Sequence, residues 1–187
     1  MKRTLLASAA LIAVCTLSAQ DGRPSLGVEL AVPVGDLSDA TSFGFGATVG
    51  YEMPVMDQVA VIAQAGYLLF PGKDINAGLV TIEGGNWGMI PVQVGGKYYL
   101  TGDQEGVYLA ALLGIHHISY KIPATTTSVF GFPVTTPEQK FSETNFSFAP
   151  GIGYVVAENI DLGLRYQVVT TSGSSSSYLG LRAAYMF

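Results

Sequence analysis

The stretch YLGLRAAYMF at residues 178–187 places an apolar side chain at every second position. Successive side chains of a β-strand point to opposite faces, so this period predicts a strand with one wholly apolar face. Gly180 and Arg182 fall on the other face. Such a strand separates an apolar environment on one side from a polar environment on the other.

Runs with the same period of two recur along the whole chain. Most of them contain about 10–14 residues, whereas strands of soluble proteins average about 5–6 and a tilted membrane-spanning strand needs about 9–11. The eight runs are residues 25–34, 43–53, 58–70, 87–100, 107–122, 145–157, 161–171 and 178–187. Eight is an even number, as in bacterial single-chain outer-membrane barrels.

The segments between the runs alternate in length. Residues 54–57, 101–106 and 158–160 are short, and the remaining segments include all the long ones, 35–42, 71–86, 122–144 and 172–177. Short turns at one end and longer loops at the other are typical of the periplasmic and extracellular ends of outer-membrane barrels.

The two faces of the runs differ in chemistry. One face carries only apolar residues, and the other carries many glycines together with Glu29, Glu52, Gln64, Gln93, Lys97, Arg165, Gln167 and Arg182. A lysine or arginine that faces lipid at the bilayer midplane costs about 2–4 kcal/mol, so we expect the charged face to line a lumen. A soluble lipocalin-like barrel would have the reverse arrangement. We therefore predict an all-β fold, an eight-stranded antiparallel up-and-down transmembrane β-barrel.

Composition supports a membrane protein. Of the 187 residues 12% are charged and 49% are hydrophobic, whereas about 25% of an average soluble domain is charged. The net charge of −5 excludes a polybasic nucleic-acid binder. Residues 1–20 are predicted to be a secretory signal peptide, with Lys2 and Arg3 before an apolar segment and small residues near Ala19. A short anchoring helix and lipidation at Cys15 are the alternatives. Residues 21–187 then form the barrel domain.

The chain resembles small OmpA/OmpX-type outer-membrane β-barrel proteins over essentially all of residues 21–187. The most specific residues are 180–187, because alternating hydrophobics before a terminal aromatic resemble the signal that the barrel assembly machinery recognises. Tyr185 and Phe187 are the signal residues, although Arg182 stands where the family prefers glycine. The resemblance implies a bacterial outer-membrane location, outer-membrane lipid as the surrounding partner, and the assembly machinery as a partner during biogenesis.

The charged face predicts a polar network inside the barrel, because an eight-stranded barrel is just wide enough to be filled by its side chains. We count two carboxylates, Glu29 and Glu52, against the three cations Lys97, Arg165 and Arg182. Closure requires the last strand to pair with the first, which places Arg182 beside Glu29. A proton or ion path through these residues is the alternative.

Two adjacent histidines are the remaining candidates for chemistry. His116 and His117 point to opposite faces of a strand and cannot share a metal ion. His117 and Ser119 resemble the His-x-Ser pair of lipid A deacylases, which are also eight-stranded barrels, but Tyr120 replaces that family's asparagine and no acidic partner is evident. We expect a histidine at the membrane rim and no catalytic, cofactor or metal site.

The loop at 122–144 contains an apolar tip, VFGFPV at residues 129–134. It is expected to form a hairpin that either makes surface contacts or packs against Leu79, Val80 and Ile82. The predicted function is a non-enzymatic barrel with an envelope-structural or surface-contact role and a filled lumen. A narrow channel for small apolar molecules and a lipid A-modifying enzyme are the alternatives, and the sequence names no surface ligand.

Overall fold

The computed structural model describes residues 22–73, 75–77, 80–82, 85–102, 104–122, 125–129, 132–171 and 173–187. The predicted signal peptide, residues 1–20, lies outside the described residues. None of the described helices is long and apolar enough to cross a membrane.

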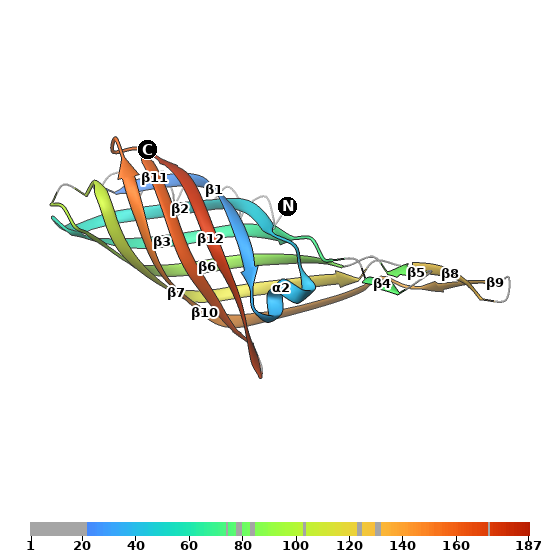
Figure 1. Ribbon diagram of the computed structural model, residues 1–187. Coiled ribbons are helices and arrows are strands. Elements are labelled where there is room, and N and C mark those ends of the chain that lie inside the picture. Colours follow the sequence, from blue (N-terminus) through green and yellow to red (C-terminus); the bar gives the residue numbers. More distant parts are fainter. Residues whose placement is uncertain are drawn as a thin grey trace, which may run out of the picture.

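Eight long antiparallel strands form a closed barrel (Figure 1), which confirms the predicted fold class. Each strand pairs with its neighbours in sequence, and the last pairs with the first, with Leu30 opposite Leu181. The barrel strands are β1 (Arg23–Val34), β2 (Gly44–Met56), β3 (Val59–Phe70), β6 (Asn86–Tyr99), β7 (Gly106–Ile122), β10 (Gln139–Val156), β11 (Ile160–Thr171) and β12 (Ser174–Met186).

The two ends of the barrel differ as the connection lengths predict. Short turns join β2 to β3, β6 to β7 and β10 to β11 at the turn end, where the chain also ends at Phe187. The opposite end, the loop end, carries helix α2 (Asp36–Ala40) and two β-hairpins that project beyond the barrel (Figure 1). These hairpins are formed by β4 (Ile75–Ala77) with β5 (Val80–Ile82) and by β8 (Thr125–Val129) with β9 (Phe132–Thr136).

The hairpin expected in the 122–144 loop is therefore present, and its proposed packing against Leu79, Val80 and Ile82 lies outside the described side chains. The predicted starts of two strands are wrong, because β12 begins at Ser174 and not at residue 178, and β10 begins at Gln139 and not at residue 145. Strand β10 remains paired with β7 beyond the barrel, up to Gln139 opposite Ile122. Both faces of this extension meet water, so the apolar alternation that marks a spanning strand is lost there.

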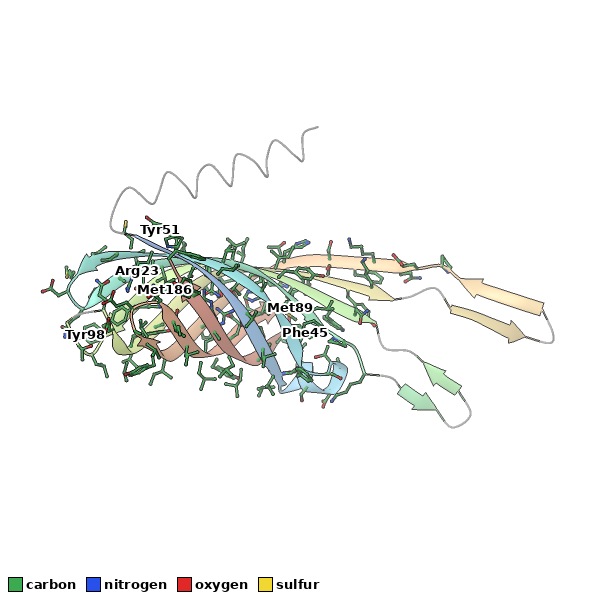
Figure 2. The ribbon with its side chains drawn as sticks, turned by 90° about the horizontal axis from the view of Figure 1, so that it is seen from above. Arg23, Phe45, Tyr51, Met89, Tyr98 and Met186 are labelled. Atoms are coloured by element: carbon green, nitrogen blue, oxygen red, sulfur yellow. The ribbon has the colours of Figure 1, made fainter. Side chains whose placement is uncertain are left out.

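Burial alternates along the strands as the charge pattern requires. Val28 and Leu30 of β1 are 63% and 49% exposed, whereas Glu29 between them is 1% exposed. Among the residues labelled in Figure 2, Phe45 and Tyr98 lie on the outer wall toward opposite ends, and Met89 and Met186 are buried inside. The apolar face therefore forms the outside of the barrel.

The lumen is more apolar than the sequence suggested. At the loop end, Leu37 of α2 inserts into a cluster made with Ala31, Leu68, Phe70, Met89, Ile118, Val169 and Tyr178. At the turn end, the cluster consists of Ala60, Tyr99, Tyr108, Val155 and Met186. Ile62, Leu112 and Ala149 form a third cluster between them. These apolar clusters close both ends of the lumen around the charged residues.

Glycines on the inner face let neighbouring strands approach closely. A Cβ atom added at Gly95 would lie 1.9 Å from the Ala111 carbonyl oxygen, and one added at Gly114 would lie 2.1 Å from the Val92 carbonyl oxygen. No side chain fits in that space, so glycine is required at both positions.

Candidate functional site

The carboxylate of Glu52 is the centre of the charged cluster toward the turn end. Its Oε1 accepts hydrogen bonds from Arg23 Nη2 at 2.5 Å and from the Tyr99 hydroxyl at 2.6 Å. Its Oε2 accepts one from Lys97 Nζ at 2.7 Å. Glu52 is 4% exposed and Lys97 is 6% exposed. A buried carboxylate with three donors is well satisfied, so these contacts fix β1, β2 and β6 to one another.

Lys97 connects Glu52 to a second carboxylate, Asp161 of β11. Lys97 Nζ lies 3.0 Å from Asp161 Oδ2 and 4.3 Å from the ring centroid of Tyr108. Asp161 also accepts hydrogen bonds from Arg182 Nη1 at 2.9 Å and from the Tyr108 hydroxyl at 2.6 Å. The network therefore crosses the lumen from one wall to the other.

The third carboxylate, Glu29, forms a separate pair toward the loop end. Arg165 Nη2 donates to Glu29 Oε1 at 2.7 Å and to Oε2 at 2.8 Å. Glu29 stands opposite Arg182 in the register of β1 and β12, as closure of the barrel requires. The guanidinium of Arg182 nevertheless turns away and contacts Asp161, Thr48 and Ser25.

The three predicted glutamines lie in the lumen but form no hydrogen bond with the charged groups. Gln93 Nε2 lies 3.3 Å from Ser147 Oγ, and Gln64 Nε2 is buried without a partner among the described atoms. Gln167 Nε2 donates to the carbonyl oxygen of Phe148 at 3.1 Å. This last contact lies next to Pro150, which has no N–H to offer the neighbouring strand.

Two members of the network were absent from the sequence prediction, so the predicted count of two carboxylates and three cations is too low. Arg23 and Asp161 bring the lumen groups to three carboxylates and four cations. Both stand at the first or second residue of a strand, where the apolar alternation is weakest. The alternation of faces along each strand would have identified both residues. Arg23 is an even number of residues from Glu29 and shares the inner face of β1 with it, and Asp161 likewise shares the inner face of β11 with Arg165.

A cavity of about 60 Å³ lies in the middle of the lumen, lined among others by Gln64, Arg165, Arg182, Ile62 and Leu112. Gln64 Nε2 and Arg165 Nη1 are buried and have no hydrogen-bond partner among the described atoms. One water needs about 10–15 Å³ of such volume, so the cavity has room for a few water molecules. Elsewhere, the charged groups and apolar clusters occupy the lumen.

The two histidines lie on opposite faces, as expected from their adjacency. His116 is buried, with Nε2 at 3.1 Å from the Tyr178 hydroxyl, whereas His117 is exposed and its Nδ1 lies 2.9 Å from Thr144 Oγ1. A hydroxyl thus occupies the place where an acid would orient a catalytic histidine. Ser119 Oγ contacts the Gly88 carbonyl oxygen at 3.4 Å. The described residues also contain no group of three or more metal-ligating His, Cys, Asp or Glu side chains.

Comparison with known proteins agrees with this architecture. A family model described as outer membrane protein β-barrel domain matches residues 4–187. The solved structure of Ail, the attachment invasion locus protein of Yersinia pestis, is 18% identical, with 89% of this chain and 97% of Ail covered and a TM-score of 0.59. Neisserial surface protein A is 16% identical, with coverage of 88% and 95% and a TM-score of 0.54.

The N-terminal β-barrel domain of OprF from Pseudomonas aeruginosa is also similar, at 15% identity, 89% and 100% coverage and a TM-score of 0.52. At these identities the structural likeness shows the fold alone. No curated protein matches the sequence.

Proposed function

Because the chain belongs to the outer membrane protein β-barrel family and is located in the bacterial outer membrane, we propose that it is a non-enzymatic barrel with a surface-contact role. The observation that carries this proposal is the contrast between the two parts of the molecule. The lumen is closed by side chains, whereas paired strands and hairpins extend from the loop end. The part that projects from the barrel is therefore the part available to a partner.

Closure of the lumen argues against a transport role. Leu37, Phe70 and Tyr178 pack across the loop end, and Tyr99 and Tyr108 pack across the turn end with ring centroids 5.5 Å apart. Between these clusters the ion pair of Lys97 on β6 with Asp161 on β11 crosses the lumen. A solute would have to displace all of these contacts together.

The surface-contact role rests on the β-structure at the loop end. Strands β7 and β10 stay paired well beyond the Ile115–Phe146 pair, and the β4–β5 and β8–β9 hairpins lie farther out still (Figure 1). This β-structure presents extended backbone to the medium, which suits contact with another surface. The similar structure of Ail carries the name of an attachment protein.

A narrow channel is the second candidate, favoured by the cavity of about 60 Å³ between the charged clusters. Planar-bilayer recordings on the full chain separate the two candidates. We expect conductance far below that of an open porin. A stable porin-like conductance would overturn the closed-lumen proposal.

Trypsin treatment of intact cells tests the orientation and the exposed part together. Lys121 and Lys140 flank the β8–β9 hairpin and are exposed, whereas Lys97 is 6% exposed inside the lumen. We expect cleavage at Lys121 and Lys140 and none at Lys97. Replacing residues 125–136 with a short turn should then lower attachment of expressing cells to matrix-coated plastic while the barrel still folds. Unchanged attachment would argue for a purely structural role.

Biogenesis is inferred from the two ends of the sequence. We infer that residues 1–20 direct export and that β12 with Tyr185 and Phe187 is recognised by the barrel assembly machinery. Tyr185 and Phe187 are 51% and 69% exposed on the outer wall, and their rings meet edge to face at 5.0 Å. Such exposure in the last strand makes the two aromatics accessible to an assembly factor.

A further inference from the structure

The outer face of the β7–β10 pair changes from apolar to polar in one step. The cross-strand pairs from Leu109–Ile152 to Ile115–Phe146 carry no charged side chain. The next three outward pairs are His117–Thr144, Ser119–Ser142 and Lys121–Lys140. We call these six residues the donor column. It continues the lipid-facing wall directly and lies on two adjacent strands.

All six side chains of the donor column can donate hydrogen bonds and none is a carboxylate. Lys121 and Lys140 stand directly opposite each other and form no ion pair with a described side chain. The nearby Glu143 is paired with Ile118 and therefore lies on the other face. Like charges directly opposite on a strand pair are destabilising, so the arrangement calls for an external anion.

The height of the column selects the kind of anion. Successive outward pairs are two residues apart, about 6.7 Å along a strand and about 5 Å along the axis of a barrel tilted by about 40°. The lysine pair thus lies about 15 Å above the Ile115–Phe146 pair. A phospholipid headgroup layer extends only about 5–8 Å beyond the hydrocarbon. A phosphorylated sugar headgroup is thicker and spans the column from His117 to the lysines.

We propose that the donor column is a binding site for the phosphorylated glycolipid headgroup of the outer leaflet, lipopolysaccharide in chemical class. Lys121 and Lys140 contact its anionic groups, and the Ser142 hydroxyl donates to a sugar or phosphate oxygen. Ser119 already donates to the Gly88 carbonyl oxygen, and Thr144 Oγ1 contacts His117 Nδ1. The pair of lysines is confined to β7 and β10. The other described lysine at the loop end, Lys73, lies on a different loop and donates to the Ser38 carbonyl oxygen. The site therefore orients bound glycolipid on one side of the barrel.

The single tryptophan of the chain lies on the inner face of the neighbouring strand β6, packed against the apolar cluster of the loop end, and reports on the donor column through the backbone of β7. Trp87 packs against Tyr120 with ring centroids 4.7 Å apart and the ring planes tilted by 41°, and Asn86 stands opposite Lys121. The experiment places the full chain in phosphatidylcholine nanodiscs that contain increasing fractions of lipopolysaccharide and follows Trp87 emission. Parallel series use dephosphorylated lipopolysaccharide, and inorganic phosphate added to pure phosphatidylcholine discs.

We expect a saturable change with phosphorylated lipopolysaccharide only. The double variant K121Q/K140Q should lower the affinity about thirtyfold. The control K73Q, which removes one exposed lysine charge elsewhere at the loop end, should alter it less than twofold. The lower mobility of boiled samples on gels confirms that every variant is folded. An unchanged affinity of the double variant would overturn the site. Equal binding of dephosphorylated lipid, or the same response to free phosphate, would overturn the assignment to a phosphorylated headgroup.

Discussion

Neutralising Glu29 tests whether the buried ion pairs hold the barrel together. In the variant Glu29→Gln, Arg165 keeps its charge inside the lumen, at 7% exposure, without the two hydrogen bonds of 2.7 and 2.8 Å that now compensate it. Removing one partner of a buried pair typically costs about 3–5 kcal/mol, and we expect a loss of that size in the free energy of unfolding.

The assay is reversible denaturant unfolding in lipid vesicles, followed by Trp87 emission and by the gel mobility of unboiled samples. Glu29→Gln/Arg165→Gln removes both charges and should recover more than half of the loss, because an uncompensated charge, and not the lost attraction, dominates the cost. Glu143→Gln removes an exposed carboxylate and serves as the matched control. A loss below about 1 kcal/mol for the single variant, within the range of an exposed ion pair, would refute this account of the lumen. A double variant as unstable as the single one would do the same.

Three further predictions use neighbouring residues or neighbouring steps as controls. Gly95→Ala should lower the free energy of unfolding by about 3 kcal/mol or more, or prevent folding, because its Cβ would lie 1.9 Å from a backbone oxygen. In the control Gly96→Ala the nearest atom to the new Cβ is 3.6 Å away, so an unboiled sample should migrate on a gel as folded protein. Tyr99→Phe should lower the unfolding free energy by about 1.5–3 kcal/mol, because it removes the 2.6 Å hydrogen bond to Glu52. Tyr98 is exposed on the outer wall, so Tyr98→Phe should change the unfolding free energy by less than about 0.5 kcal/mol. Equal effects of the two variants would contradict a special role for the buried hydroxyl. Phe187→Ala should reduce the amount of protein in the outer membrane of cells but leave refolding into detergent unchanged; a defect in refolding as well would show that the aromatic ring acts through stability and not through recognition.

Much of the architecture was predictable from local pattern. Period-two alternation identified the eight spanning strands, and Lys97, Arg165 and Arg182 showed which face could not meet lipid. The alternation of apolar and polar residues failed to mark strands outside the membrane, where no lipid contacts one face of the strand. Above the membrane both faces of β10 meet water, so Gln139 does not look like the start of a strand. Arg23 and Asp161 were overlooked because they stand where strands begin.

The amino-acid sequence by itself determined the barrel, its strand number and the inward direction of its charges, because the cost of a charge in lipid acts on each residue separately. Only the tertiary structure decided which charges meet. Arg182 is the register neighbour of Glu29, yet its long side chain reaches Asp161, and Glu29 is paired with Arg165 from the next strand but one. The length of each side chain across a narrow lumen decides which charges are paired, and the apolar residues that close the two ends confine them there. Both effects arise from contacts between residues that are far apart in the sequence.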